Sequence, residues 1–244
     1  MCVVTAKYFD KEGWCIAKNR DQDYVAKSSF IDDEHHKVGE IMYYYDHEIK
    51  YKEGLNHAGL AIITASLTPI MSLETNQSDG NNIFKALEYD TPEEAAKFLI
   101  SKKVTGFLFI FTKDKLILVE AARENDGKGD YKFTQREVPK TEQICRTNHG
   151  VDLKWAGFQS GRDETQDVWR KSSEMRKKFA ETAIKNAKDP IQMLDGLSLK
   201  YTDDLQMNVF RVEYKPRQMR TIFQWAIVPS KSTVYVRPIQ NIMT

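Results

Sequence analysis

Three pairs of strand-like segments, each joined by a short turn, constrain the fold of this chain more than any other feature. The first pair, Cys2–Tyr8 and Trp14–Lys18, flanks turn residues that run from Asp10 to Gly13. The other two pairs are Thr105–Thr112 with Lys115–Ala121 and Thr221–Val228 with Thr233–Arg237. Turns this short join neighbouring antiparallel strands. The sequence therefore predicts antiparallel sheets built from hairpins, with Leu60–Leu67 as a further strand.

Helices are predicted between the strand pairs. Thr91 is the expected N-cap of the first, Pro92 its first residue, and Glu94 completes a capping box, so a helix runs from here to about Ser101. A longer amphipathic helix is predicted from Thr165 to Ala187, and a short one begins after it at Asp189-Pro190. The expected buried stripe of the long helix consists of Val168, Met175, Phe179 and Ala183. Helices that alternate with strand pairs indicate an α+β fold.

Composition excludes several classes of protein. The 244 residues contain no repeat and no low-complexity linker, so we expect a single domain over residues 1–244. The net charge of +1 arises from 36 basic and 35 acidic residues that are well mixed, which argues against nucleic acid or an anionic membrane as a partner. No apolar run reaches the length of a membrane span, and no signal-peptide pattern begins the chain.

The cysteines and the acidic clusters restrict the compartment and the cofactors. Three cysteines argue against a disulfide framework and for a reducing compartment, so we expect a cytoplasmic protein. The segment Asp32–His36 contains metal-ligand residue types, but consecutive residues rarely converge on one ion, and we expect a solvated loop there. No metal and no other cofactor is predicted. The sequence does not fix the oligomeric state.

The first hairpin makes a geometric prediction about Cys2. If Lys11-Glu12 is a two-residue turn, directly opposed residues have numbers that sum to 23. Cys2 then lies opposite Asp21, with a basic and amide-bearing segment next to it. That segment consists of Lys18, Asn19 and Arg20.

This combination suits a nucleophile at a chain end. Once Met1 is removed, the α-amine of Cys2 has an unperturbed pKa of about 7.7–8.0 and can accept the thiol proton near neutral pH. Asp21 can orient this amine, and the neighbouring cations can lower the thiol pKa. The alternative is that Cys2 is only a small buried hydrophobe at the start of a strand.

These residues resemble the opening of the cysteine N-terminal-nucleophile (Ntn) hydrolases, in particular the group of choloylglycine hydrolase and acyl-coenzyme A:6-aminopenicillanic acid acyltransferase. That group carries Gly-Arg-Asn-x-Asp on the second strand, where this chain has Ala17–Asp21, so Lys18 stands where an Arg is usual. Further segments match in the same order. They are Gly54–Leu60, the hairpin Phe107–Glu120, the Thr-Asn-His loop at Thr147–His149, and the Ser-Ser-x-x-Arg segment at Ser172–Arg176.

The resemblance implies a fold and a set of roles. The implied fold is a four-layer αββα sandwich, in which two antiparallel sheets lie face to face and helices cover both outer faces. Asn148 would donate to the oxyanion and Arg176 would point at the nucleophile, with Asn56 as a second candidate donor. Each of these residues also has an ordinary structural interpretation. Asn148 and Asn56 are common turn and loop residues, and an Arg on a Lys-rich helix is usually solvated.

The implied activity is hydrolysis or acyl transfer at a linear amide C–N bond of a small acylated molecule. The site residues are predicted in two groups. They are Cys2, Lys18, Asp21, Asn148 and Arg176 as catalytic residues, and Asn19, Arg20 and Asn56 as oxyanion or substrate contacts. Between the two cations of the second strand, Lys18 is favoured because it occupies the family's Arg position. A rival hypothesis is an inactive binding or scaffold protein that retains Met1. A Cys145–His149 pair is a weaker nucleophile candidate.

Overall fold

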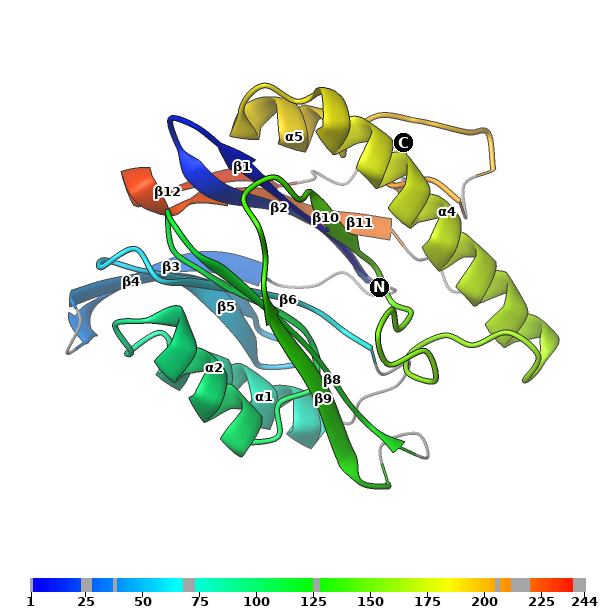
Figure 1. Ribbon diagram of the computed structural model, residues 1–244, viewed down its shortest axis with the longest axis horizontal. Helices are drawn as coiled ribbons and strands as arrows, with labels where there is room; N and C mark the ends of the chain where they lie inside the picture. Colours follow the sequence, from blue (N-terminus) through cyan, green and yellow to red (C-terminus); the bar gives the residue numbers. More distant parts are fainter. Residues whose placement is uncertain are drawn as a thin grey trace.

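The chain forms four layers in the order helix, sheet, sheet, helix (Figure 1). The computed structural model describes residues 2–22, 28–36, 39–67, 73–124, 128–204, 207–211 and 220–238. Every strand pairs with its neighbours in the antiparallel sense. The predicted αββα sandwich is therefore confirmed.

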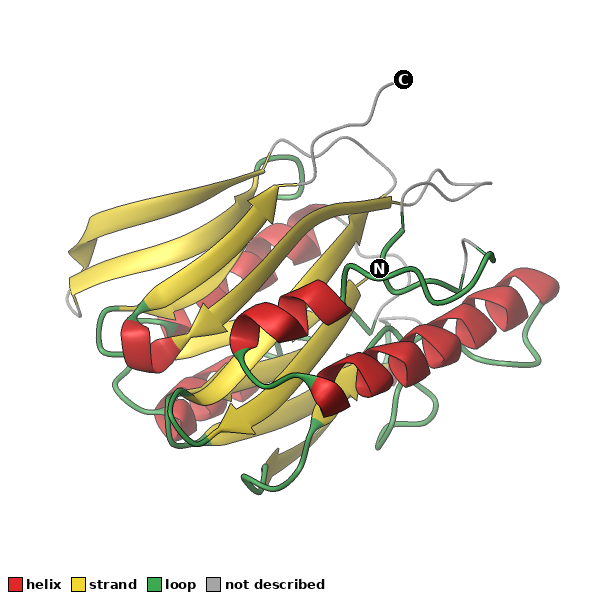
Figure 2. Cartoon of the chain, turned by 90° about the horizontal axis from the view of Figure 1, so that it is seen from above, coloured by secondary structure: helices red, strands yellow, loops and turns green. Residues whose placement is uncertain are grey.

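The first sheet has five strands and carries the start of the chain. In spatial order they are β10 (Ile144–Arg146), β1 (Cys2–Phe9), β2 (Gly13–Gln22), β11 (Arg220–Val228) and β12 (Thr233–Pro238). A short 3-10 turn, η1 (Pro229–Lys231), joins the last two strands. Figure 2 shows α4 (Glu164–Asn186) and α5 (Pro190–Gly196) lying across the outer face of this sheet.

The second sheet has seven strands in the order of the sequence. They are β3 (Ser28–His36), β4 (Gly39–Asp46), β5 (Tyr51–Asn56), β6 (Ala61–Ala65), β7 (Gly106–Phe111), β8 (Leu116–Arg123) and β9 (Tyr131–Glu137). Its outer face is covered by α1 (Leu73–Ala86) and α2 (Pro92–Ser101) (Figure 1). Among the described residues, no helix is long and apolar enough to cross a membrane.

Strand β7 shows why its sequence contains an unbroken apolar run. Phe107, Phe109 and Phe111 face the core between the two sheets, whereas Leu108 and Ile110 face α1 and α2. All five side chains are fully buried, and each contributes about 1.5–3 kcal/mol by leaving water. Burial on both faces is what a strand inside a four-layer sandwich requires.

Several expected elements differ in detail. The predicted α2 begins as expected, because the Thr91 side chain accepts a hydrogen bond from the Glu94 amide. The expected loop at Asp32–His36 is wrong, since these residues belong to β3, although their side chains lie outside the described part. The expected stripe of α4 is also wrong at Val168, which is 40% exposed. The buried face of this helix consists of Trp169, Ser172, Ser173, Arg176, Ala180 and Ile184.

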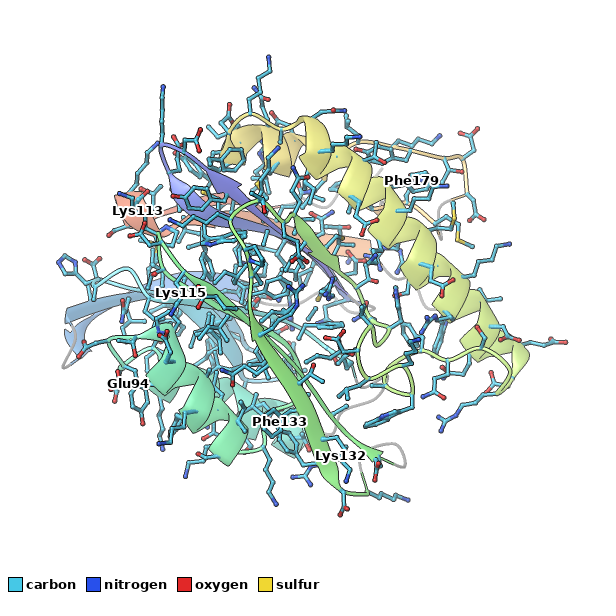
Figure 3. The ribbon with its side chains drawn as sticks, in the orientation of Figure 1. Glu94, Lys113, Lys115, Lys132, Phe133 and Phe179 are labelled. Carbon is cyan, nitrogen blue, oxygen red and sulfur yellow. The ribbon has the colours of Figure 1, made fainter. Side chains whose placement is uncertain are left out.

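The first hairpin exists, but its predicted register is wrong by one residue. The turn has three residues, Asp10–Glu12, and Phe9 pairs with Gly13, so opposed residues sum to 22. Gly13 adopts φ +77, a left-handed conformation that closes three-residue hairpin loops. A Cβ on Gly13 would lie 2.2 Å from the carbonyl oxygen of Lys113, which is labelled in Figure 3 and lies in the β7–β8 turn. Packing between the two sheets therefore selects this turn.

The corrected register decides which side chains share a face with Cys2. Cys2 pairs directly with Arg20 and Val4 pairs with Lys18, so both cations lie on the side of the thiol, between the sheets. Because side chains alternate along a strand, Asn19 and Asp21 project to the opposite side, toward α4 and α5. The predicted pairing of Cys2 with Asp21 is therefore replaced by a pairing with Arg20.

Candidate active site

Cys2 begins β1 at the edge of the core between the sheets, where its side chain packs in the same cluster as Val4. Only 5% of the residue is exposed, and its thiol is free. The backbone nitrogen of Cys2 donates to Oδ1 of Asn148 across 2.9 Å. The start of β1 thus lies beside the loop that follows β10 (Figure 1), although 146 positions of sequence separate the two residues.

Hydrogen bonds hold both the side chain and the backbone of Asn148. Its side-chain Nδ2 donates to the carbonyl oxygen of Ser66 across 2.8 Å. Its backbone nitrogen donates to the hydroxyl of Ser173 across 3.0 Å, and its carbonyl oxygen accepts from the amide of Phe158. The chain packs against Asn148 again at Gly157, which has φ +73. Only glycine fits there, because a Cβ on it would lie 2.4 Å from the backbone carbonyl oxygen of Asn148. The side chain is therefore fixed against Cys2.

Glu120 holds the next part of the same loop. Its buried carboxylate accepts hydrogen bonds from three successive backbone amides, those of Val151, Asp152 and Leu153, each across 2.9 Å. Hydrogen bonds to a charged acceptor are stronger than neutral ones. The Glu that ends the β7–β8 hairpin motif thus anchors the loop that carries Asn148.

Arg20 is the cation directly opposite Cys2. Its Nη2 donates to the Asp46 carboxylate across 2.8 Å, and its guanidinium lies over the rings of Tyr44 and Tyr51. Burial alone would lower the pKa of this guanidinium, but four neighbouring groups together raise it well above its ordinary value. These groups are Tyr44, Cys2, Asp46 and Glu53. Arg20 is therefore a fixed positive charge in electrostatic contact with the thiol.

Lys18 was the favoured cation, and the structure gives it a different environment. It lies one pair further from the chain end, opposite Val4, and its ammonium forms a buried ion pair with Glu53 of β5. The same ammonium lies over the ring of Trp225. Arg20, rather than Lys18, therefore faces Cys2 directly across the hairpin, and the catalytic preference for Lys18 stays a prediction.

Asp21 lies in a buried cluster on the outer side of the sheet. Its carboxylate forms an ion pair with Arg176 of α4, accepts from the Thr221 hydroxyl across 2.8 Å, and lies 3.7 Å from Nη1 of Arg211. The side chains of Asp21, Arg176 and Arg211 are 0% exposed. Arg176 is buried, and its direct partner is the carboxylate that follows Arg20 in β2, on the side of the sheet opposite the Cys2 thiol.

Two expected substrate contacts have structural partners instead. Asn56 donates to the carbonyl oxygens of Leu87 and Tyr89 after α1, and its Oδ1 accepts from the Leu60 amide. The prediction of Asn56 as an oxyanion donor is therefore wrong, because both of its amide hydrogens bond the backbone at the opposite face of the second sheet.

Asn19 is engaged in a similar way beneath α5. Its Nδ2 donates to the carbonyl oxygens of Leu197 and Val209, and its Oδ1 accepts from the Gln224 side chain. The prediction of a substrate contact at Asn19 is wrong for the same reason. This residue joins β2 to the outer helical layer.

The other two cysteines are poor nucleophiles in this structure. Burial raises the pKa of both Cys15 and Cys145 to about 12, so neither carries thiolate near neutral pH. Burial also lowers the pKa of His149 to about 4, and its Nδ1 contacts the hydroxyls of Ser173 and Thr147 rather than a thiol. A Cys145–His149 pair is therefore not supported.

Comparisons with known proteins identify the architecture. No family model and no curated protein matches the sequence. Among the solved structures that match, two cover almost the whole chain. One is the N-acylethanolamine-hydrolyzing acid amidase ortholog of Caenorhabditis elegans, with a TM-score of 0.55, 10% sequence identity, and coverage of 98% of this chain and 100% of that chain. The other is a C2A mutant of the conjugated bile acid hydrolase from Clostridium perfringens, with a TM-score of 0.56, 13% identity, and coverage of 100% and 91%.

Both neighbours are cysteine Ntn-hydrolases. The chain has the Ntn-hydrolase fold. At these identities the likeness establishes the fold, and it agrees with the resemblance that the short motifs carry. Within an Ntn-hydrolase sandwich, Cys2 occupies the start of a strand in the first sheet, between the two sheets.

The candidate site also contains residues that sequence reasoning did not identify. Arg211 and Thr221, which both contact Asp21, lie in segments without any motif. Ser172 and Ser173 enter the sequence prediction only as part of the motif that ends at Arg176. Their spacing is a usable signal, because positions three and four before a buried helical Arg lie on the same face.

Proposed function

We propose that this chain cleaves a linear amide C–N bond in a small acylated molecule, with Cys2 as the nucleophile. The observation that carries the proposal is the 2.9 Å bond from the Cys2 nitrogen to Asn148, within an Ntn-hydrolase fold and beside the Arg20 charge. The proposal requires removal of Met1, which converts that nitrogen from an amide into an amine that can take a proton.

The reaction would proceed in two steps. The α-amine of Cys2 takes the thiol proton, the sulfur attacks the substrate carbonyl carbon, and the C=O electron pair moves to oxygen. As the tetrahedral intermediate collapses, the protonated amine of Cys2 gives its proton to the leaving nitrogen, the C–N bond breaks and a thioester remains. Water, or a second amine in the case of acyl transfer, then attacks the thioester and releases the thiol.

The surrounding residues have separate roles in this scheme. Oδ1 of Asn148 fixes the Cys2 amine, and its Nδ2, which carries two hydrogens, is the proposed oxyanion donor. Arg20 stabilises the thiolate, and its Nε is buried with no hydrogen-bond partner among the described residues. Asp21, held by Arg176, is the proposed carboxylate that orients the amine.

The names of the two structural neighbours favour the same class of substrate. One hydrolyses N-acylethanolamines and the other hydrolyses conjugated bile acids, according to their descriptions. An amide between an acyl group and a small amine is the bond that the arrangement around Cys2 suits. Hydrolysis and acyl transfer share the thioester, and the nature of the acceptor distinguishes them.

The direct test uses a panel of fluorogenic N-acyl aminocoumarins of different acyl length. Purified protein should release aminocoumarin, and Cys2→Ala should release none while it keeps the wild-type melting temperature. Cys145→Ala is the matched control and should remain active. Full activity of Cys2→Ala would contradict the proposal.

The rival hypothesis is an inactive binding or scaffold protein that retains Met1. Intact mass spectrometry of protein from its natural source distinguishes the two, because loss of Met1 is required for the amine to act as the base. Protein that retains Met1 throughout and releases no aminocoumarin would favour the rival.

A further inference from the structure

The hydroxyl of Ser173 connects helix α4 to three consecutive residues of the loop beside Cys2. Its Oγ donates to Oγ1 of Thr147 across 2.8 Å, accepts from the backbone nitrogen of Asn148 across 3.0 Å, and lies 2.8 Å from Nδ1 of His149. The Thr147 hydroxyl in turn donates to the Ser173 carbonyl oxygen across 3.0 Å. Ser173 is 0% exposed, so water does not compete for these bonds.

These contacts saturate the serine hydroxyl. A hydroxyl has one hydrogen to donate and two lone pairs that accept. If the hydrogen goes to Thr147, both lone pairs accept, one from the Asn148 amide and one from a hydrogen on His149 Nδ1. This arrangement places the proton of the neutral His149 on Nδ1, and it leaves Ser173 a single orientation.

A direct chain of bonds then leads from Ser173 to the nucleophile. Ser173 fixes the backbone of Asn148, and the Asn148 side chain bonds the nitrogen of Cys2. Glu120 fixes the loop beyond this point, from Val151 onward, and does not contact Asn148 itself through its three amide bonds. The Asn148 backbone nitrogen therefore has its hydrogen-bond acceptor on one side chain of α4.

We propose that Ser173 is a positioning residue for the reaction at Cys2 and that it acts through Asn148. This inference rests on the proposed function. Loss of the Ser173 hydroxyl removes the acceptor of the Asn148 backbone amide and releases Thr147 and His149. The Asn148 side chain then keeps only its bonds to Ser66 and Cys2, and its position shifts with the loosened backbone. A misplacement of about 1 Å in a catalytic arrangement costs roughly 100-fold in rate.

The test is a double-mutant cycle on turnover of the fluorogenic amide. We expect Ser173→Ala to lower kcat by roughly 10- to 100-fold with KM within about twofold of wild type, because the substrate contacts remain. The double variant Ser173→Ala/Asn148→Ala should be no slower than Asn148→Ala alone, because the two residues act in series. Ser198→Ala is the matched control. It removes a half-buried serine hydroxyl with two hydrogen bonds, to Leu194 and Gln224, and should keep wild-type turnover.

Several outcomes would overturn the inference. Wild-type kcat in Ser173→Ala would do so, and so would losses that multiply in the double variant, because a general loss of stability acts independently of Asn148. If Ser173→Ala does not fold, Ser173→Cys replaces it, because a thiol of similar shape accepts the Asn148 amide only weakly. An unchanged kcat in Ser173→Cys would then reject the proposal.

Failure of the proposed function is recognised separately. Full activity of Cys2→Ala would reject Cys2 as the nucleophile. The effect of Ser173 on Cys2 would then need a measurement that does not depend on turnover. The rate of Cys2 alkylation by iodoacetamide, followed by mass spectrometry, supplies that measurement. If Cys2→Ala is inactive but Ser173→Ala has wild-type kcat, only the role of Ser173 fails.

Discussion

The free energy of unfolding of this protein should fall at acidic pH because of His149, whose ring is buried beside Asn148. Burial lowers the pKa of His149 to about 4 from an ordinary value of 6.5, with smaller contributions from the positive charges of Arg170, Lys177 and Arg146. The folded protein therefore binds this proton less readily than the unfolded chain does. Stability from the neutral ring is fully present above pH 6.5 and is lost as the pH falls from 6.5 toward 4.

The magnitude follows from the size of the shift. A pKa difference of one corresponds to about 1.4 kcal/mol. The fall from 6.5 to about 4 therefore limits the contribution of His149 to the free energy of unfolding to about 3 kcal/mol. Between pH 7 and pH 5 the free energy of unfolding should fall by about 2 kcal/mol from this residue alone. Only 5% of the His149 residue is exposed, so solvent screens the effect little.

His149→Asn isolates this contribution. The amide of Asn does not titrate in this range and can still donate to the Ser173 hydroxyl. The free energy of unfolding of both proteins would be measured in urea at pH 7 and pH 5. We expect wild type to lose about 2 kcal/mol more than the variant, since contributions of other titrating groups cancel in the comparison. An equal loss in the two proteins would refute the account of a neutral, buried His149.

Three further predictions concern residues with defined contacts. Arg20→Met should slow alkylation of Cys2 by iodoacetamide near neutral pH more than Lys18→Met does, because Arg20 faces the thiol; a larger effect at Lys18 would contradict the register argument. Burial raises the pKa of Asp79 from 3.8 to about 6, so the ionised carboxylate destabilises the fold at pH 7. Asp79→Asn should therefore raise the free energy of unfolding at pH 7 by about 3 kcal/mol, with little gain at pH 4, provided that the amide oxygen still accepts from Thr105. Lys7 donates to three carbonyl oxygens at the end of α4, so Lys7→Met should lower stability by about 1–2 kcal/mol and the melting temperature by roughly 2–8 °C; an unchanged melting temperature would show that water replaces these bonds.

The three hairpins and helix α2 were predictable because their signals are local, whereas α1 was not predicted. The capping sequence Thr91–Glu94 forms the expected cap, and β7 and β8 pair across Lys113-Asp114 as predicted. The β3–β4 hairpin was not predicted, because Asp32–His36 is strongly polar and resembles a loop in sequence. A polar edge strand has the composition of a loop, and only its pairing with β4 distinguishes the two.

The register at Cys2 depends on a contact that the sequence around it does not contain. The three-residue turn requires the left-handed Gly13, which packs against the Lys113 carbonyl about one hundred positions away in sequence. A two-residue turn fits the local sequence equally well. Arg211 was not predicted either, because it reaches Asp21 only through long-range contacts of the folded chain.

The alternation along β2 explains why a one-residue error matters so much at this site. In the segment Lys18–Asp21, the two cations share one face and the amide and the carboxylate share the other. The cations meet acidic residues of the second sheet, Asp46 and Glu53, while Asp21 meets Arg176 of the outer helix. A shifted register would exchange the faces and leave these buried charges without their partners, at a cost of several kcal/mol for each. The ion pairs on both sides of β2 therefore hold the register that places Arg20, and not Asp21, opposite the thiol of Cys2.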